Sequence, residues 1–321
     1  MEAALLLGGE GRRLKPLTDR LPKPLVPLGG EPLFHHTLRR VLPHVKRIHL
    51  LTAGDPLIWQ EYAEGSPFRE VLAISHEEER LGTGGGIRAL LQRVRPPLVV
   101  VNGDLVLEGE LTPFLEFSRN AASRGQVGVL LALHVPDRSP YGSLLLQGER
   151  VEGFQEKGVG GEGWIYGGIA VLFEGAEEYF PTKKVLSLER EVFPSMAEAG
   201  VLSAFRLRAP FSDAGTLRGL LKAQRIIMDS PLWPFKEFTS SRLKAFTPPL
   251  YISPQARVGR GCSVGPYVTV AGEVALEEGA RVENSVILDG ARVGRGAVVV
   301  GSALSPGTVV GEGEVVRGRI L

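Results

Sequence analysis

The chain has 321 residues, which is long for one ordinary core and comfortable for two domains. Apolar residues make up 43% of it, so a packed interior can form and wholesale disorder is excluded. The 37 lysines and arginines nearly balance the 36 aspartates and glutamates, which excludes the strongly basic charge of a typical nucleic-acid binder. Local cationic clusters therefore point to small anionic ligands.

The cysteine count and the apolar runs indicate the compartment. A single cysteine, Cys262, rules out an intramolecular disulfide and suits a reducing cytoplasm. The chain starts Met-Glu-Ala-Ala-Leu, without the basic segment of a signal peptide. Its longest apolar runs, residues 3–7 and 97–101, are too short to cross a bilayer. We therefore expect a cytoplasmic protein with no membrane span and no nucleic-acid partner.

The first part of the chain, residues 1–229, alternates short apolar runs with helical stretches. This alternation predicts an α/β, Rossmann-like domain with a mixed but mainly parallel sheet, in which ligands bind at the carboxyl ends of the strands. The expected strands are residues 3–7, 47–52, 71–74, 98–101, 127–133 and 169–173. The expected helices are residues 33–41, 84–93, 111–122, 187–199 and 215–228.

Residues 230–250 form a segment in which this pattern stops. Four prolines interrupt it, and four aromatic residues can anchor it: Trp233, Phe235, Phe238 and Phe246. Because proline disfavours both helix and central strand, we predict a linker that packs on the first domain.

The last segment, residues 251–321, has a different periodicity. Aliphatic residues recur every six positions from Ile252 to Val282, and again in a shifted phase from Ile287 to Val299. This period fits a β-helix, in which each group of six residues forms one side of a triangular coil. The alternative, a glycine-rich β-sandwich, would not need so strict a period. We predict a β-helix of about four coils.

A glycine-rich loop follows the first apolar run. Residues 8–14 read Gly-Gly-Glu-Gly-Arg-Arg-Leu. Glycines after a strand let backbone amides approach a phosphate chain, although this spacing matches neither the P-loop nor the dinucleotide fingerprint. Taken alone, the loop could be a plain tight turn. Its continuation adds the cations Arg13, Lys15 and Lys23, with prolines on both sides of Lys23 that stiffen the segment.

Residues 7–27 resemble the signature of the sugar-1-phosphate nucleotidyltransferases, Gly-Gly-x-Gly-Thr-Arg-Leu-x-Pro-Leu-Thr followed by Pro-Lys-Pro. The chain resembles the mannose-1-phosphate guanylyltransferase-like members, and a hexapeptide tail folded as a left-handed β-helix is seen in a subset of this family. The resemblance implies catalytic roles for Arg13 and Lys23. Arg12 replaces a threonine or serine, which leaves its role open. Nucleotide binding is implied for Leu7, Gly8, Gly9 and Gly11.

A second glycine-rich segment, residues 81–87, reads Leu-Gly-Thr-Gly-Gly-Gly-Ile. It resembles the Leu-Gly-Thr-Ala-Gly segment of the family, whose backbone lies against the nucleobase. The resemblance therefore implies nucleotide contacts at Gly82 and Thr83. A glycine-rich helix start is the alternative reading of this segment on its own.

Two aspartates are candidates for a metal site. Asp104 follows the buried run 98–101, where ligand sites form in α/β sheets, and a carboxylate there suits Mg²⁺. A turn-forming Asn-Gly-Asp is the alternative for Asp104. Asp213 lies in Phe-Ser-Asp-Ala-Gly-Thr, which resembles the Trp-x-Asp-x-Gly-Thr of the family, and Ser212 or Asp213 could also cap a helix. We expect Mg²⁺ on Asp104 and Asp213.

The sugar-binding residues are implied by resemblance. Residues 154–157, Phe-Gln-Glu-Lys, resemble the Phe-x-Glu-Lys-Pro of the family. This implies that Glu156 accepts hydrogen bonds from sugar hydroxyls and that Lys157, as a catalytic residue, binds the sugar phosphate. Gly142 lies in a turn that resembles a sugar-contacting one. Gly168 lies where family members often have Asn-Ala-Gly, and the asparagine of that triplet is missing here.

The implied reaction joins a nucleoside triphosphate and a sugar-1-phosphate into a nucleotide sugar and pyrophosphate. The attacking phosphate oxygen is already largely anionic at neutral pH, so no general base is needed and the six histidines are expected at surface or packing positions. Residues 82–87 resemble most those of guanylyltransferases that act on mannose-1-phosphate or heptose-1-phosphate, so GTP with mannose-1-phosphate is the expected pair. UTP or dTTP with glucose-1-phosphate-type sugars is the alternative.

Two other classes of function compete with this one. Hexapeptide β-helices often belong to acyltransferases, which generally use a histidine base, but residues 251–321 contain no histidine. A catalytically silent regulatory homologue would be expected to lose the cations or the carboxylates named above. We also expect self-association, because the end coil of a β-helix must be covered.

Overall fold

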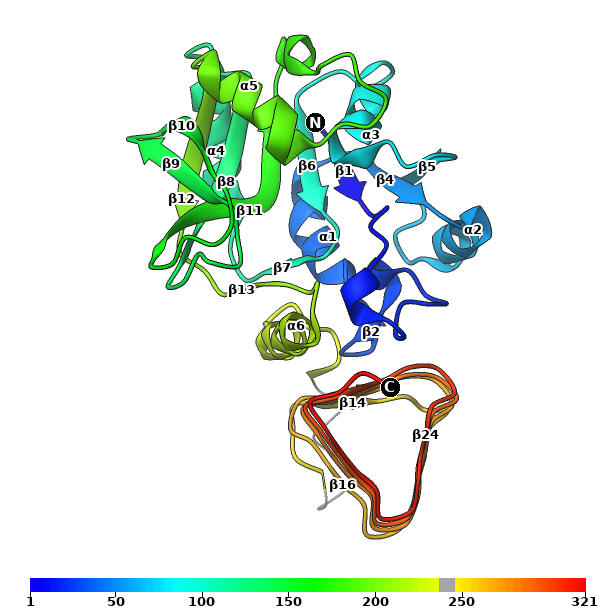
Figure 1. The fold of residues 1–321 in the computed structure, drawn as a ribbon. Helices are drawn as coiled ribbons and strands as arrows, with labels where there is room; N and C mark the ends of the chain where they lie inside the picture. The colour runs from blue at the N-terminus through cyan, green and yellow to red at the C-terminus, as the bar shows by residue number, and fades with distance from the viewer. Residues whose placement is uncertain (237–245) are drawn as a thin grey trace. The chain divides into compact units, whose positions relative to one another are not determined.

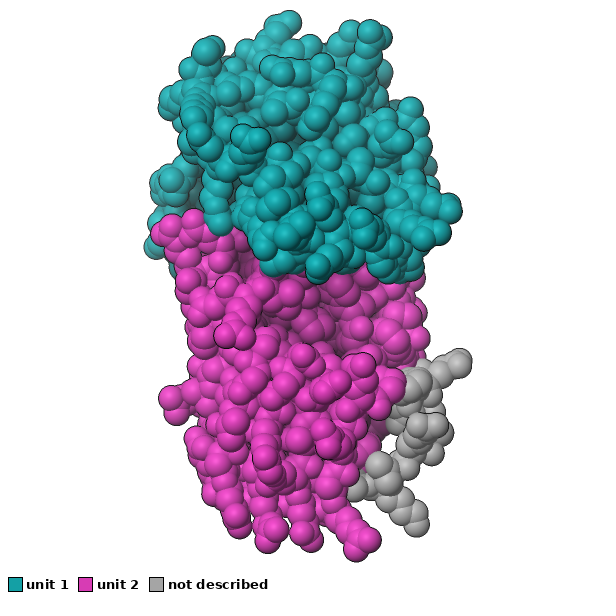
Figure 2. All heavy atoms as spheres, turned by 90° about the vertical axis from the view of Figure 1, so that its right-hand side faces the viewer, with its two compact units in different colours: residues 1–8, 40–103, 109–209 teal, residues 9–39, 104–108, 210–321 magenta. Residues whose placement is uncertain are grey.

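The computed structural model describes residues 1–236 and 246–321. The chain divides into two compact units that interleave in sequence. Unit 1 contains residues 1–8, 40–103 and 109–209, and unit 2 contains residues 9–39, 104–108 and 210–321 (Figure 2). In the described part of the chain, no helix has the length and apolar character needed to cross a membrane.

Four parallel strands form one side of a nine-stranded sheet in unit 1 (Figure 1). Their order is β5-β4-β1-β6, and Leu6 of β1 pairs with both Leu51 and Asn102, so three carboxyl ends meet at one edge. β1 is buried between its neighbours, because Ala3, Ala4 and Leu5 have no exposed surface. The strands are β1 (Glu2–Leu6), β4 (Ile48–Ala53), β5 (Leu72–Glu77) and β6 (Leu98–Asn102).

The other side of the sheet is largely antiparallel. β11 runs antiparallel to β6 and β8, β12 is parallel to β8, and the hairpin β9–β10 forms the far edge. The sheet is thus mixed, as predicted, but the sequence did not predict β9, β10 or β12. The hairpin strands carry mostly exposed or half-buried residues, so they lack a continuous apolar run. The strands are β8 (Gly128–Val135), β9 (Ser143–Gln147), β10 (Arg150–Gln155), β11 (Gly163–Leu172) and β12 (Leu202–Leu207).

Helices cover both faces of this sheet. Ile87 of α3 and Phe193 of α5 share a core with Ala204 of β12, whereas the next residue, Phe205, stacks against Phe114 of α4. Successive strand residues point to opposite faces, so α4 lies on the face opposite α3 and α5. The helices of unit 1 are α2 (Pro56–Gly65), α3 (Gly82–Leu91), α4 (Thr112–Ala122) and α5 (Phe193–Glu198), whereas α1 (His35–Val41) begins in unit 2 and ends in unit 1.

Unit 2 begins with short elements. A ribbon pairs β2 (Pro27–Leu28) with β3 (Glu31–Pro32), and β7 (Leu105–Leu107) pairs antiparallel with β13 (Phe211–Asp213). Helix α6 (Leu217–Asp229) follows. Its cap is Thr216, whose Oγ1 accepts a hydrogen bond from the amide of Gly219 at 3.1 Å. Neither Ser212 nor Asp213 is therefore the N-cap residue of this helix.

The C-terminal part of unit 2 is a left-handed parallel β-helix of three four-stranded sheets, which confirms the prediction of about four coils (Figure 1). One sheet contains β14 (Leu250–Ile252), β17 (Val268–Val270), β20 (Ser285–Ile287) and β23 (Ala303–Leu304). A second contains β15 (Arg257–Val258), β18 (Ala275–Leu276), β21 (Arg292–Val293) and β24 (Val309–Val310). The third contains β16 (Ser263–Val264), β19 (Arg281–Glu283), β22 (Val298–Val300) and β25 (Val315–Arg317).

One corner of the coil explains the shifted phase in the sequence. Leu250 pairs with Val268 18 residues later, whereas Val268 pairs with Ser285 only 17 residues later. The residues that stack at this corner have positive φ angles. From the second coil onward, the chain turns this corner with one residue fewer. We call this set the corner column: Tyr267 (55°), Asn284 (45°), Gly301 (60°) and Gly318 (61°).

A buried chain of hydrogen bonds joins the β-helix to the rest of unit 2. Gln224 of α6 is fully buried; its amide nitrogen donates to the carbonyl of Tyr267 at 2.7 Å, and its amide oxygen accepts from the Thr269 hydroxyl at 2.6 Å. The same hydroxyl accepts from the amide of Gly29, whose carbonyl accepts from the Trp233 indole, both at 2.8 Å. Because these buried polar groups are paired, the chain fixes α6 against the β-helix without a desolvation penalty.

The described residues of segment 230–250 make contacts within unit 2. Trp233 is buried, the rings of Phe235 and Tyr251 lie 4.9 Å apart, and Phe246 forms an isolated bridge with Val264. Residues 237–245, which include Phe238, lie outside the described residues.

Candidate active site

The opening glycine loop is held by its own backbone and one threonine. In unit 1, Leu7 is buried and its amide donates to the carbonyl of Leu51 at 2.9 Å, so β1 ends rigidly beside Gly8. In unit 2, Gly11 has a left-handed backbone (φ 64°), and its carbonyl accepts from the Thr18 hydroxyl at 2.9 Å. No described atom lies within 4 Å of a side-chain position on Gly9. The loop therefore offers open backbone to a ligand.

Lys23 and Asp104 form an ion pair in unit 2. The Lys23 ammonium contacts Asp104 Oδ2, and Lys23 is only 9% exposed because flanking prolines fold it into a short 3₁₀ turn. The carbonyl of Asp104 accepts from the amide of Ala214 at 3.1 Å, and Asp213 pairs with Leu105 across β7 and β13. Strand pairing therefore brings the two candidate metal carboxylates side by side.

Gly215 places Arg13 next to Asp213. A β-carbon at position 215 would lie 2.5 Å from a guanidinium nitrogen of Arg13 and 2.9 Å from Asp213 Oδ1. A larger residue here would displace one of these two side chains. Sequence reasoning named Arg13 and Asp213 but missed Gly215 and Thr18, although both lie inside the motifs that carry the resemblance.

The electrostatics of this group in unit 2 favour a cation. Although Asp213 is exposed overall, surrounding protein atoms raise its pKa by desolvation, and the negative charge of Asp104 raises it further. Lys23 and Arg13 act in the opposite direction. Two carboxylates that repel each other suit Mg²⁺, which takes one or two protein carboxylates and completes its shell with water and phosphate oxygens. Among the described residues, no group of three or more histidine, cysteine or carboxylate side chains offers a fuller metal cage.

Arg12 pairs with Glu10 rather than with Asp104 or Asp213. Its guanidinium forms an ion pair with Glu10, and the Arg12 side chain is 78% exposed. An exposed pair of this kind contributes little to stability. Arg12 is thus available to exchange Glu10 for an anionic ligand.

In unit 1, the segment that begins α3 is tied to residues 186–188. The amides of Gly84 and Gly85 both donate to the carbonyl of Leu186, at 2.7 and 3.3 Å, and the hydroxyl of Thr83 accepts from the amide of Leu188 at 3.0 Å. Thr83 thereby positions the segment by binding protein backbone. Gly82 has a positive φ of 75° at the start of the helix.

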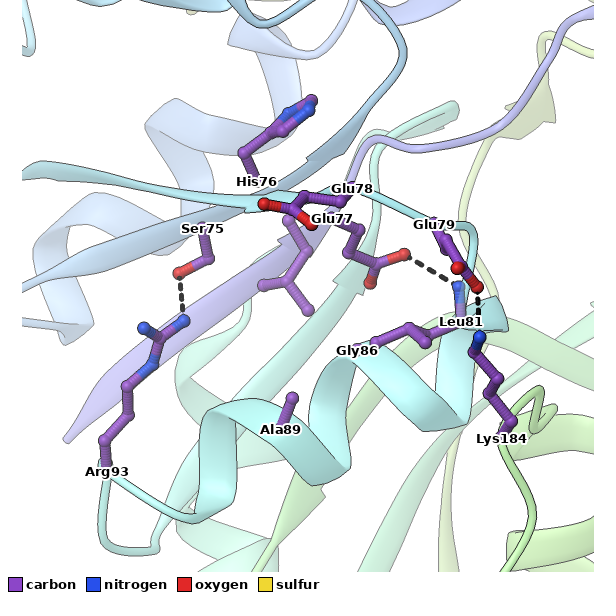
Figure 3. Close-up of a pocket in the computed structure, with 11 residues that line it drawn as sticks. Ser75, His76, Glu77, Glu78, Glu79, Leu81, Gly86, Ala89, Arg93 and Lys184 are labelled. Atoms are coloured by element: carbon purple, nitrogen blue, oxygen red, sulfur yellow. Dashed lines mark hydrogen bonds and ion pairs between the residues drawn. The ribbon is translucent and has the colours of Figure 1, made fainter.

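Beside α3 lies a hollow of about 320 Å³ (Figure 3). At its wall, Glu77 Oε2 accepts from the amide of Leu81 at 3.1 Å, and burial raises the pKa of Glu77. A β-carbon at Gly86 would collide with the other Glu77 oxygen, so this glycine makes room for the carboxylate. Sequence reasoning missed Glu77. This residue ends β5, the strand before α3, and it positions the segment that begins at Gly82.

The predicted sugar-binding residues lie in unit 1, with Gly142 and Glu156 at one end of the β9–β10 hairpin and Gly168 on β11, which pairs with β9. Ser143 pairs with Gln155, so Gly142 and Glu156 are neighbours just beyond that pair. Glu156 and Lys157 are exposed and form no hydrogen bond or ion pair with any described residue. Gly168 lies on β11 with φ 73°, where a β-carbon would be 3.3 Å from Asn102.

The buried histidines serve packing, as predicted. His36 is 3% exposed and its Nε2 lies 3.2 Å from the carbonyl of Leu107. His49 Nε2 lies 2.6 Å from Glu2 Oε2.

Comparison with protein families gives two matches that together span nearly the whole chain. The family described as nucleotidyl transferase matches residues 2–230. The family described as GMPPB C-terminal domain matches residues 246–321.

Individual relatives agree with these matches. The chain is 30% identical to mannose-1-phosphate guanylyltransferase catalytic subunit beta from Danio rerio, over 91% of this chain and 82% of the relative. It is 30% identical to mannose-1-phosphate guanylyltransferase from Mycobacterium tuberculosis, over 91% and 81%. A crystal structure of HddC from Yersinia pseudotuberculosis complexed with GMP-PN has 28% identity and a TM-score of 0.60, covering 70% of this chain and 98% of that one.

Proposed function

Because the chain belongs to the nucleotidyl transferase family, we propose that it transfers a nucleotidyl group from GTP to mannose-1-phosphate, releasing pyrophosphate. The names of its relatives, mannose-1-phosphate guanylyltransferases, support this pair of substrates. UTP or dTTP with a glucose-1-phosphate-type sugar is the alternative. The observation that carries the proposal is the gathering of Arg13, Lys23, Asp104 and Asp213 in unit 2.

The reaction brings together two anions that repel each other, so catalysis is mainly a matter of alignment and charge neutralisation. Arg13 stabilises the charge that develops on the leaving pyrophosphate. Lys23, nearly buried and already turned towards Asp104, holds the phosphate at the reacting centre. Fixed cations of this kind act without reorganisation during the reaction, which is why they favour the transition state.

Asp104 and Asp213 would hold a magnesium ion. Such an ion neutralises phosphate charge and orients the phosphate oxygens when it is bound. The residues present fit this role, since the charge of Asp104 adds to the desolvation that raises the pKa of Asp213. Lys23 would share Asp104 with such an ion, because a carboxylate has two oxygens to offer.

The substrates meet further residues of the chain. Leu7, Gly8, Gly9 and Gly11 present backbone to the nucleotide, as do Gly82 and Thr83. Lys157 binds the sugar phosphate, and Glu156 accepts hydrogen bonds from sugar hydroxyls. Their exposure leaves both side chains available to a ligand. Gly142 and Gly168 allow the sugar to approach the backbone.

Each segment has its own task in this proposal. Residues 1–229 carry out catalysis, residues 230–250 link, and the β-helix of residues 251–321 supports α6 and mediates self-association into a homo-oligomer. The buried hydrogen bonds that connect Gln224 with Trp233 support the proposed role of the β-helix in holding α6 in place. The single cysteine supports a cytoplasmic location.

A substrate grid tests the proposal. The purified chain is incubated with Mg²⁺, each of five nucleoside triphosphates and several sugar-1-phosphates, and pyrophosphate release is measured. We expect GTP with mannose-1-phosphate to give the highest kcat/KM. Release with UTP or dTTP and glucose-1-phosphate would select the alternative. No release with any pair, from folded protein, would identify a catalytically silent homologue.

A further inference from the structure

A basic hollow lies in unit 2 between α6 and the corner column of the β-helix. It measures about 630 Å³, within the range of roughly 300–1,000 Å³ that small-molecule sites occupy. Figure 1 shows α6 beside one corner of the triangular coil. The lining residues are Leu217, Arg218, Leu221, Lys222, Arg225 and, from the column, Asn284, Gly301 and Gly318. None of them belongs to the residues proposed above for the substrates.

The charge of this hollow is one-sided. Arg218, Lys222 and Arg225 face it, and no aspartate or glutamate lines it. Within residues 1–236 and 246–321, Arg218 and Lys222 form no ion pair. Burial lowers the pKa of Lys222, and the neighbouring charge of Arg218 lowers it further. Like charges held together without counter-ions attract an anion strongly.

Two of the cationic side chains that line the hollow are held in position by contacts with neighbouring residues. Arg225 donates to the Asn284 side chain at 3.0 Å and lies 5.2 Å from the centre of the Tyr267 ring. The Lys222 ammonium lies 5.2 Å from the centre of the Phe211 ring. The glycines of the corner column carry no side chain, so the wall opposite α6 stays open to a ligand.

The remaining surface is apolar. Leu221 is 7% exposed and Leu217 is half-buried, and both lie on α6 beside the cations. A bare inorganic ion would use only the charged half of such a cavity. A ligand with a phosphate and a carbon body would use both halves, since guanidinium and ammonium groups bind phosphate oxygens with charge-assisted hydrogen bonds.

We propose that this hollow binds a small organic phosphate, with its phosphate group between Arg218 and Lys222 and its carbon body against Leu217 and Leu221. The site is distinct from the group formed by Arg13, Lys23, Asp104 and Asp213. It does not depend on the proposed enzymatic activity, because binding alone defines it.

Calorimetric titration of the full chain tests this site. The probes are mannose 6-phosphate, which carries no phosphate at C1, and inorganic phosphate. The test variant is the double charge reversal Arg218→Glu/Lys222→Glu. The matched control is Arg257→Glu/Arg260→Glu, which makes the same change of charge at exposed positions of the β-helix that do not line the hollow. The swap Arg218→Lys/Lys222→Arg keeps both charges and checks that the helix folds, together with circular dichroism.

We expect mannose 6-phosphate to bind the wild type, the control and the swap variant with Kd values within about threefold of one another. The charge reversal should weaken that binding by about tenfold or more, because two charge-assisted hydrogen bonds are lost. Unchanged affinity in the charge-reversal variant would overturn the proposed site. Equal affinity for inorganic phosphate and mannose 6-phosphate in the wild type would overturn the role of the apolar wall. Both affinity comparisons can be interpreted even if the chain releases no pyrophosphate with any pair of substrates, because they measure binding alone.

Discussion

The β-helix and the opening loop of unit 2 reach their structures by different means. In the β-helix, the same inward aliphatic contact is repeated from coil to coil, so each coil packs on its neighbours. The stability of this part is therefore a sum of similar contributions from the coils. In the loop, single contacts that occur once each hold the backbone, such as Thr18 with Gly11 and Lys23 with Asp104. The residues proposed for catalysis therefore lie where the structure is least redundant.

The largest effect is expected from the loop's carboxylate partner. Asp104→Asn keeps the shape of the side chain and removes its charge, so turnover should fall by about 10²–10³-fold while the fold is retained. The measurement is pyrophosphate release under saturating substrates. Asp19→Asn, an exposed carboxylate paired with Lys15, is the control and should stay near the wild-type rate. A near-normal rate for Asp104→Asn would remove this residue from the mechanism.

The opposite behaviour is expected in the β-helix. Ile287 is fully buried, so Ile287→Ala should lower the free energy of unfolding by about 2–5 kcal/mol with little change in kcat. Urea denaturation monitored by circular dichroism measures the loss. Val309→Ala, at a position that is 69% exposed, should change stability by less than about 0.5 kcal/mol. Equal losses in both variants would contradict an interior held by aliphatic packing.

Gly215 tests whether a single added methyl group disturbs the loop. In Gly215→Ala the new β-carbon would displace Arg13 or Asp213, and turnover should fall by about tenfold or more, because small misplacements of catalytic groups are costly. The assay is kcat at saturating substrate concentrations. Gly65→Ala adds a methyl group where no described atom lies within 4 Å, and it should be silent. If both variants kept full activity, the close approach would have no catalytic importance.

The smallest effect concerns the ribbon that follows the loop. Burial alone would raise the pKa of Glu31, but the hydrogen bond with His35 and the ion pair with Arg39 outweigh it and lower that pKa. A lowered pKa in the folded state means that Glu31 stabilises the protein above its unfolded pKa of about 4.3. This contribution is lost as the pH falls through the folded pKa.

Urea midpoints between pH 7 and pH 2.5 measure that contribution. Glu31→Gln should be less stable than the wild type at pH 7, and the gap should narrow as the pH falls below about 4. Glu149→Gln, in an exposed ion pair with Arg124, is the matched control and should follow the wild type. A gap for Glu31→Gln that stays constant with pH would show that charge is not the cause.

The sequence predicts the β-helix well because its signal is periodic, and each coil repeats the same spacing. It also predicts the strands β1, β4, β5, β6 and β8 and five helical regions to within a few residues, and the C-terminal half of β11, which begins six residues earlier than expected. It fails at α2 and at β9, β10 and β12. The hairpin strands carry few buried residues, so their positions are set by pairing with β11 and β12 rather than by an apolar run of their own.

The candidate site shows a similar limit. The resemblance names Lys23, Asp104 and Asp213, yet nothing in the sequence shows that Lys23 contacts a carboxylate 81 positions away. Such pairings depend on strand order. Glu77 and Thr18 act on the backbone of glycine segments, and a residue that supports backbone leaves no spacing rule by which to find it.

The 17-residue spacing of the corner column has a consequence for changes in the length of the chain. Deleting or adding one residue within a strand would turn the aliphatic side chains that follow in that strand away from the interior, whereas the change from 18 to 17 residues is absorbed at the corner. A duplication of 17 residues, starting at any point after Ser285, would instead insert one complete rung and lengthen the stack by about 4.8 Å. The β-helix can therefore gain or lose complete coils, while the first coils keep their hydrogen bonds with Gln224 and Arg225.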